Sequence, residues 1–191
     1  MNEDLKYEID AAVKALKEGD IILYPTDTVW GLGCDATNGD AIQRIFDLKQ
    51  RDDSKSVIVL VSDADMLCKY VRQIPPIAID LLEVNDKPMT IIYPEGINLS
   101  DKVIAQDGSV AIRIPQNEFC VEMIRRFGLP VVSTSANISG EETPGCFADI
   151  NAEILDTVEH IVEPSLEETS SGKASQIIKI GMDGEVKVIR E

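Results

Sequence analysis

The sequence is short of basic residues and of histidine, and it has no long apolar run. Its 191 residues include 18 Lys and Arg against 34 Asp and Glu, so the net charge is −16. Such a surface repels nucleic acid and anionic lipid. The chain as a whole therefore lacks the basic surface of a nucleic-acid-binding protein, and binding of an anion would need a local cluster of basic residues. No apolar run approaches the roughly 20 residues that span a bilayer. The acidic start, Met1-Asn2-Glu3-Asp4, lacks the features of a signal peptide. We therefore expect a cytoplasmic protein that does not bind membranes.

Several common catalytic and metal-binding patterns are also missing. The single histidine, His160, excludes most histidine-based metal sites and offers no Ser–His–Asp set. The four cysteines include no C-x-x-C pair, and no G-x-x-x-x-G-K-[ST] phosphate loop occurs. We predict that Cys68, Cys120 and Cys146 are reduced core residues. Cys34 falls in a loop of functional interest, but a nucleophilic role for it is not favoured.

What the sequence does contain is an alternation of helical and strand patterns along its whole length. Apolar spacing and stop signals predict helices near 9–19, 40–48, 62–71, 76–84 and 119–127, with Asp40 and Ser62 as N-caps of the second and third. Short apolar runs predict strands at 21–24, 57–61, 89–93, 110–114, 129–133, 158–162, 175–180 and 186–190. We expect one α/β domain over residues 1–191, a twisted mixed β-sheet flanked by helices. Residues 163–173, rich in Glu, Ser and Thr, are expected to be a mobile loop, which makes a closing lid plausible.

Polar residues gather at two places near predicted strand ends and helix ends. Residues 25–33, Pro-Thr-Asp-Thr-Val-Trp-Gly-Leu-Gly, follow the first predicted strand, where ligands bind in open α/β sheets. An ordinary polar turn explains them equally well. Lys49, Arg51 and Lys55 form a basic cluster at a helix end, a candidate anion site, although the helix dipole by itself accounts for Lys49.

Two further segments also fit either a ligand site or an ordinary structural role. Arg113 shares one side of its predicted strand with Ala111, and it either faces water, the commoner case, or points into a cleft at the strand end. The run Ser133-Thr134-Ser135-Ala136-Asn137 supplies three hydroxyls and an amide. These groups suit phosphate or carboxylate oxygens, and they are also typical of caps and turns.

Taken in order, the four segments resemble the YrdC/Sua5 family of threonylcarbamoyl-AMP synthases in its short, single-domain form. The likeness runs from the first helix to Arg190. It implies a twisted mixed sheet with a deep ligand cleft. It also implies a nucleotidyltransferase, an L-threonylcarbamoyladenylate synthase, that converts L-threonine, bicarbonate or CO2 and ATP into threonylcarbamoyl-AMP and pyrophosphate. Mg2+ would be bound through the ATP phosphates, with no protein metal site, and a threonylcarbamoyl transferase complex would then place the t6A modification on position 37 of tRNA.

The resemblance also implies roles for individual residues. Its nucleotide contacts fall on Lys49, Arg51, Lys55, Ser109, Ser135, Asn137, Thr143 and Arg190. Its threonine contacts fall on Thr28, Arg113, Ser133 and Ser175. Lys49 and Arg51 would be the catalytic cations, because they would offset the charge that develops as pyrophosphate leaves.

The sequence departs from the family pattern at several places. Trp30 stands where the family usually has Tyr, and residues 52–56 replace a proline-containing stretch. Residues 85–90 replace the usual Pro-Gly-Pro turn before a Thr, and the tail reads Lys173-Ala174-Ser175-Gln176 where Glu-Ser-Thr is more usual. Three alternatives therefore stay open. They are a relative that uses carbamoyl phosphate, an RNA-binding module, which the net charge disfavours, and a degenerate paralogue that binds nucleotide without turnover.

Overall fold

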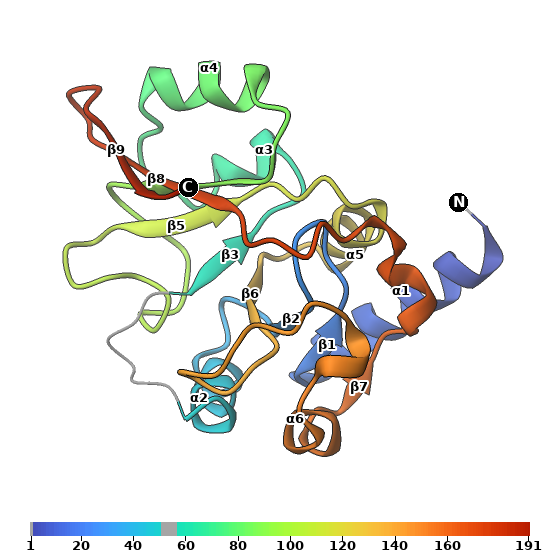
Figure 1. The fold of residues 1–191 in the computed structure, drawn as a ribbon. Helices are drawn as coiled ribbons and strands as arrows, with labels where there is room; N and C mark the ends of the chain where they lie inside the picture. The colour runs from blue at the N-terminus through green and yellow to red at the C-terminus, as the bar shows by residue number, and fades with distance from the viewer. Residues whose placement is uncertain (1, 51–56) are drawn as a thin grey trace.

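A mixed β-sheet with helices packed around it forms the fold (Figure 1), in a computed structural model that describes residues 2–50 and 57–191. Among these residues the strands join in the order β7-β1-β2-β6-β3-β5-β4-β8-β9. Their bounds are β1 Ile22–Tyr24, β2 Gly31–Gly33, β3 Ile58–Leu60, β4 Met89–Tyr93, β5 Val110–Arg113, β6 Val131–Ser135, β7 His160–Ile161, β8 Gln176–Ile180 and β9 Val186–Arg190. The pairs β1/β7, β3/β5 and β4/β8 are parallel and the others antiparallel, so the predicted mixed sheet is confirmed.

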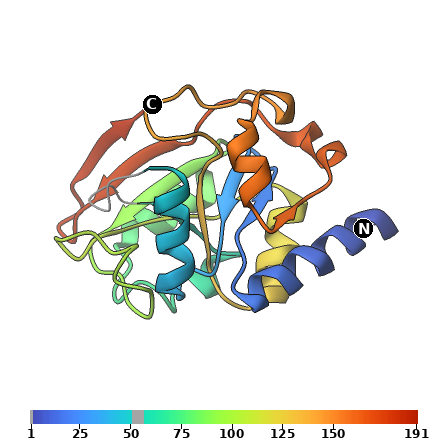
Figure 2. The same cartoon turned by 90° about the horizontal axis from the view of Figure 1, so that it is seen from below.

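The helices are α1 Glu3–Glu18, α2 Gly39–Leu48, α3 Ala64–Leu67, α4 Pro76–Val84, α5 Glu118–Phe127 and α6 Ala152–Thr157, with two 3-10 turns at Phe147–Asp149 and Pro164–Thr169. Asn or Asp side chains cap the start of all described α-helices except α4, and glycines end α1 and α5. The side chain of Asn2 caps α1 by accepting from the Leu5 amide, and Gly19 ends it at φ 82°. Helices α1 and α5 lie side by side, and α2 and α6 come to the front in Figure 2. None of the helices in the described part of the chain has the length and apolarity that crossing a membrane requires.

Strand β2 is an element that the sequence patterns missed. Residues Gly31–Gly33 pair antiparallel with β1 and with β6, although we expected a polar loop there. The glycines make this packing possible. A Cβ on Gly33 would lie 2.6 Å from the Tyr24 ring and 2.8 Å from the Val132 carbonyl oxygen. Strand β2 therefore exists because its backbone fits closely between neighbours, which no hydrophobic pattern records.

Two predicted boundaries and two predicted N-caps are also wrong. Helix α3 spans only Ala64–Leu67 and is capped by Asp63 instead of Ser62, because the chain after it turns to bridge Val71 with Gly96. Strand β6 starts two residues later than predicted, so its hydroxyls lie in the strand and not in a loop after it. Helix α2 is capped by Asn38, while Asp40 lies inside its first turn.

The cysteine prediction holds for one residue of three. Cys120 is buried, as is Cys34, whereas Cys68 is exposed and Cys146 is only partly covered. Cys68 follows the short helix α3 at the surface, where apolar neighbours in sequence do not mean neighbours in space. The predicted loop at 163–173 contains the 3-10 turn Pro164–Thr169 and several hydrogen bonds to the rest of the chain.

Candidate functional site

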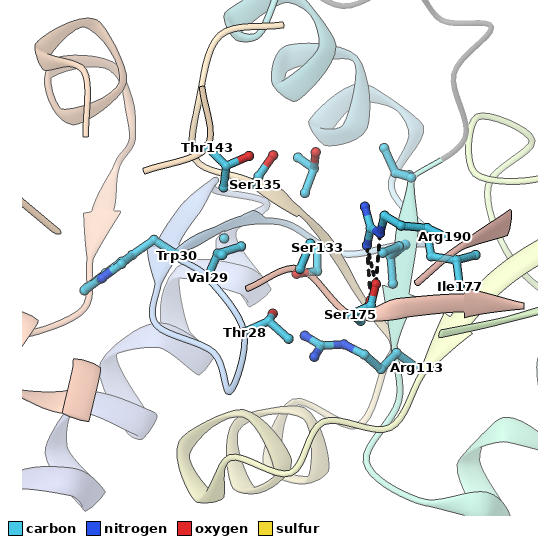
Figure 3. A pocket seen from close by; sticks show the side chains of 15 residues that line it. Thr28, Val29, Trp30, Arg113, Ser133, Ser135, Thr143, Ser175, Ile177 and Arg190 are labelled. Atoms are coloured by element: carbon cyan, nitrogen blue, oxygen red, sulfur yellow. Dashed lines mark hydrogen bonds between the residues drawn. The ribbon is translucent and has the colours of Figure 1, made fainter. Parts of the chain in front are cut away.

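A pocket of about 210 Å³ opens on one side of the sheet (Figure 3). Five parts of the chain line it: the loop after β1 with the start of β2, strand β3, the end of β5, strand β6 with the segment after it, and the β8–β9 pair. The side chains with polar or charged groups are Thr28, Trp30, Arg113, Ser133, Thr134, Ser135, Thr143, Ser175 and Arg190. No carboxylate belongs to the lining that the structure describes. The two charged side chains of this lining, Arg113 and Arg190, are therefore both cationic, in a strongly acidic protein.

Arg113 lies at the buried end of the pocket. Alternation along β5 places it on the side that faces the pocket, and only 4% of the residue is exposed, so of the two orientations left open by the sequence the arginine has the one that points into a cleft. Its Nη1 donates to Asp27 Oδ1 at 3.0 Å, and Asp27 Oδ2 accepts from the Gln116 amide at 3.3 Å. The Nε of Arg113 is buried without a hydrogen-bond partner among the described residues. A ligand carboxylate would meet an oriented guanidinium that still has a donor to offer.

Threonine side chains hold the loop that carries Asp27 in place. The Thr26 hydroxyl accepts from the amides of Thr28 and Val29 at 3.0 and 3.2 Å, which is the local turn chemistry typical of threonine. It also lies 2.8 Å from the Thr28 hydroxyl. Thr28 and Arg113 point toward each other across the pocket floor in Figure 3. The carboxylate and both hydroxyls predicted from this loop are thus brought together beside the arginine.

Ser175 and Arg190 close the pocket on the β8–β9 side. Arg190 donates to the Ser175 carbonyl oxygen through Nε at 2.9 Å and through Nη2 at 2.7 Å. The Ser175 hydroxyl in turn lies 2.8 Å from the hydroxyl of Thr90, a residue of β4 that sequence reasoning did not single out. Burial lowers the pKa of Arg190 from its usual value, and the nearby charge of Arg113 lowers it further. An anion between the two guanidinium groups would relieve that repulsion.

Lys49 is brought to the site in a way that the sequence did not suggest. It caps α2, is only 2% exposed, and donates to the carbonyl oxygens of Ser135 and Asn137. The backbone carbonyl oxygen of Lys49 in turn accepts from the Ser139 amide at 2.8 Å. Lys49 therefore fixes the segment after β6 and is absent from the described pocket lining.

The remaining predicted nucleotide contacts are spread over a wider area. Ser135 and Thr143 lie together at one side of the pocket in Figure 3. The side-chain nitrogen Nδ2 of Asn137 donates to the carbonyl oxygens of Ile138 and Glu141. The side-chain oxygen Oδ1 is buried without a partner in the described part of the chain. Ser109 lines a neighbouring hollow and donates its proton to Asp107. Arg51 and Lys55 lie outside the described residues.

Trp30 and the segment 164–171 form a tie across the outer side of the site. The Trp30 indole N–H donates to Glu167, which also accepts from the Phe147 amide at 2.7 Å. The Trp30 and Phe147 rings are 5.0 Å apart, and the indole points away from Arg113 in Figure 3. The Ser170 hydroxyl donates to the Thr28 carbonyl oxygen at 2.7 Å, and the Ser171 amide donates to that of Asp27 at 3.1 Å. The hydrogen bond to Glu167 thus comes from the indole N–H of Trp30, a group that the Tyr usual in the family does not have.

Cys34 and His160 take no part in the described pocket. Burial raises the pKa of the Cys34 thiol well above its usual value, which keeps it protonated and unreactive. Burial also lowers the pKa of His160, which lies on the strand β7 at the far edge of the sheet. In the described part of the chain no three His, Cys, Asp or Glu side chains are grouped to hold a metal ion.

The fold and the pocket define an α/β protein whose site suits an organic anion with a carboxylate or phosphate. A family model described as Sua5/YciO/YrdC, telomere recombination, matches residues 14–191, and the chain belongs to this family. A threonylcarbamoyl-AMP synthase of Pseudoalteromonas translucida (strain TAC 125) is 32% identical over 181 residues, which are 93% of this chain and 95% of the relative. The predicted family membership is confirmed.

Solved structures give the same result for the fold. P. abyssi Sua5 complexed with L-threonine superposes with a TM-score of 0.82 at 25% identity, over 92% of this chain and 51% of that one. This chain therefore spans about half the length of that protein. E. coli YciO superposes with a TM-score of 0.80 at 23% identity, over 98% of this chain and 89% of that one, a likeness of fold. The predicted fold class is confirmed.

Proposed function

We propose that this protein is a threonylcarbamoyl-AMP synthase, which joins L-threonine, bicarbonate or CO2, and ATP into threonylcarbamoyl-AMP and pyrophosphate. The observation that carries the proposal is the arrangement of Arg113, whose Nη1 is held by Asp27 while its buried Nε has no partner among the described residues. A guanidinium with free donors is a strong partner for a carboxylate. The name of the relative and the threonine complex of P. abyssi Sua5 support the proposal that this carboxylate belongs to an amino-acid substrate.

The amino acid would bind at the buried end of the pocket. Its carboxylate would pair with Arg113, and the hydroxyls of Thr28 and Ser175 would contact the rest of the molecule. Ser133 of β6 also lines the pocket and would contribute its hydroxyl or its backbone. The amine would then face the open side of the pocket, where the second and third substrates enter.

The nucleotide would occupy the side of the pocket formed by Ser135, Thr143 and Arg190. Hydroxyls and a guanidinium are suited to phosphate oxygens, and Arg190 is one of the two cationic side chains in the described lining. Asn137 and Ser109 would contact the nucleotide further out, and Lys49 would act by shaping the segment that carries Ser135. We extend the proposal to Arg51 and Lys55 as further cations for the triphosphate. Mg2+ would enter with the ATP phosphates, which supply most of its ligands.

The chemistry that follows needs no covalent enzyme intermediate. The threonine amine attacks CO2 and loses a proton, or attacks bicarbonate with release of water, to give a carbamate. A carbamate oxygen then attacks the α-phosphorus of ATP, and the bond to the departing oxygen breaks with its electrons on pyrophosphate. The protein would act by positioning and by offsetting negative charge, which are the terms that dominate phosphoryl-group chemistry.

The product would pass to a threonylcarbamoyl transferase complex that modifies position 37 of tRNA, in the cytoplasm. We expect direct RNA binding to be weak, because a net charge of −16 opposes phosphate backbones. The enzyme would release the small adenylate to the transferase complex and would not bind the tRNA itself.

Pyrophosphate release by the purified protein with Mg-ATP tests the proposal. Threonine and bicarbonate are omitted in turn, and release is expected only when both are present. Release that requires carbamoyl phosphate in place of both would favour the carbamoyl-phosphate-using relative. ATP binding without any release would favour the degenerate paralogue. RNA affinity that falls steeply with salt, again without release, would favour the RNA-binding module.

A further inference from the structure

Thr90 occupies a central place beneath the buried end of the pocket. It lies in β4, which runs between β5 and β8, and it is 0% exposed. Its register partner on β8 is Ile177, a pocket residue, and Ile92, two residues further along β4, is opposite Ala111 of β5. Because side chains two residues apart share a face of the sheet, Thr90 and Arg113 are on the same face. Thr90 therefore lies between Arg113 and the β8 strand that Ser175 precedes.

The hydroxyl of Thr90 has a specific partner. It lies 2.8 Å from the Ser175 hydroxyl, and both residues are buried. A fully buried hydroxyl costs free energy unless it is hydrogen-bonded, and the neighbouring β4 residues Ile91 and Ile92 show that this strand otherwise carries apolar side chains. Valine has almost the same shape as threonine and would fill the same space. The hydroxyl at this position therefore has a role beyond packing.

The hydrogen bonds around Ser175 indicate where the proton of the Ser175 hydroxyl points. Arg190 Nη2 lies 3.4 Å from the Ser175 hydroxyl oxygen and can only donate to it. If Thr90 donates as well, both lone pairs of the Ser175 oxygen are occupied and its own proton is left for a ligand. Ser175 would then present a donor to the pocket, beside the guanidinium of Arg113. A donor in that place suits a carboxylate or hydroxyl oxygen of an amino acid.

We propose that Thr90 is a positioning residue for the amino-acid end of the pocket, an inference that rests on the proposed function. Its buried hydroxyl holds Ser175 in one rotamer and directs the Ser175 proton toward the ligand. Thr90 does not touch the ligand itself. Its effect should therefore fall on amino-acid affinity and pass through Ser175.

Thr90→Val tests this with little change of shape, and Thr90→Ser restores the hydroxyl. Calorimetric titration with threonine and the steady-state KM values are measured for both. We expect Thr90→Val to weaken threonine binding by about 3–10-fold, the range for one lost hydrogen bond, with kcat and the KM for ATP changed less than about 2-fold. Thr90→Ser should return to within about 2-fold of the wild type. Thr157→Val, which removes an exposed threonine hydroxyl on α6, is the matched control.

A double-mutant cycle with Ser175→Ala separates positioning from general structure. If Thr90 acts through Ser175, Thr90→Val should cause no further loss of threonine affinity once Ser175 is alanine. An equal loss in both backgrounds, or a matching rise in the KM for ATP, would overturn the inference. So would unchanged threonine binding in Thr90→Val while the wild type binds threonine. If the wild type neither binds threonine nor needs it for pyrophosphate release, the proposed function fails and this inference falls with it.

Discussion

The two ends of the pocket are built in different ways. Around Arg113 the side chains are buried and joined to one another, through Asp27 and through the pair Thr90–Ser175. On the nucleotide side, Thr143 is exposed and Ser135 only partly buried, and backbone carbonyls held by Lys49 set the geometry. The first end is pre-organised by side chains, whereas the second relies on a loop and on charge.

This difference has consequences for the two substrates. A pre-organised site loses little side-chain freedom on binding, so each of its groups carries a defined share of the affinity. In a site built on a loop, ligand affinity depends on the contacts that fix the conformation of the loop. We therefore expect substitutions at the first end to change the KM for threonine alone, and substitutions under the second end to change ATP binding together with thermal stability.

The largest effect should come from Arg113→Lys. Lysine keeps a charge near Asp27 but lacks the planar fork that pairs with a carboxylate through two donors. We expect the KM for threonine to rise about 10–100-fold, as for the loss of a charged hydrogen bond, while the KM for ATP changes less than about 3-fold. Pyrophosphate release at varied threonine measures this. Lysine is preferred to alanine because alanine would leave the buried Asp27 unpaired, at a cost of about 3–5 kcal/mol.

The control for this substitution is Arg126→Lys, because Arg126 forms a more exposed ion pair with Asp10 on the α1–α5 side of the molecule. A threonine KM that stays within about 3-fold of the wild type in Arg113→Lys would contradict the assignment. It would also remove the contrast between the two ends, since the buried ion pair would then serve folding only.

Lys49→Met should give the next largest effect, and it should fall on the other end. Methionine fills similar space but leaves the carbonyl oxygens of Ser135 and Asn137 without this donor, at about 1–3 kcal/mol each. We expect Tm to fall by roughly 4–24 °C and the KM for ATP to rise about 10-fold or more, with threonine binding changed less than about 2-fold. Thermal melts and calorimetry measure the two quantities. A rise in the KM for ATP without any loss of Tm would mean that the ammonium binds phosphate directly. Lys17→Met, at an exposed position of α1, is the control.

Strong local patterns predicted much of the fold, and close tertiary packing accounts for what they missed. Strands β4 and β9 have the predicted bounds, 89–93 and 186–190, because β-branched and apolar runs there are bordered by turn residues. Strand β2 has only Gly-Leu-Gly, which carries no strand signal. It forms because Gly33 fits against Tyr24 and the Val132 carbonyl, residues that the sequence cannot show to be neighbours.

The same limit applies to the site. Arg113 and Asp27 are 86 residues apart, so no spacing rule links the guanidinium to its carboxylate. A lysine at a helix end has the same sequence context whether it faces a phosphate or a backbone carbonyl. Ser133 to Asn137 suit a turn as well as a strand end. The residue types were therefore predictable, but which contacts each side chain makes was decided by the fold.

Glu167→Gln should have a smaller effect, because Glu167 ties the outer segment to the pocket without lining it. Glutamine keeps one acceptor but loses the charge that strengthens the bonds from Trp30 and Phe147. We expect cleavage between residues 163 and 173 by a broad-specificity protease to rise about 3–5-fold and the KM for threonine to rise about 2–3-fold.

Limited proteolysis of the wild type and of an exposed control, Glu163→Gln, completes this experiment. ATP plus threonine should slow cleavage of the wild type if the segment closes over bound ligand. Cleavage that is the same in Glu167→Gln and in the wild type would show that the Trp30–Glu167 bond does not hold the segment. Cleavage that ligands leave unchanged would count against closure.

The smallest expected effect belongs to Ser109→Ala. Ser109 lies on the same face of the sheet as Arg113, because it lines a hollow with Ala111, which is two residues before Arg113 on β5. Lys179 and Ser109 hold the pKa of Asp107 well below its usual range, so Asp107 stays a carboxylate and accepts the Ser109 proton. The Ser109 oxygen then has only lone pairs for a ligand. It suits a donor such as a ribose hydroxyl or an exocyclic amine, and not a phosphate oxygen.

Two ligands, ATP and inorganic tripolyphosphate, distinguish these roles. We expect Ser109→Ala to raise the KM for ATP about 2–3-fold, and to leave inhibition by tripolyphosphate, which has no nucleoside, unchanged. An equal loss for both ligands would place Ser109 at the phosphates and would mean that ligand binding displaces Asp107. No change for either would remove Ser109 from the nucleotide end. That end would then consist of Ser135, Asn137, Thr143 and Arg190 with the loop that Lys49 supports, and its dependence on backbone geometry would be greater still.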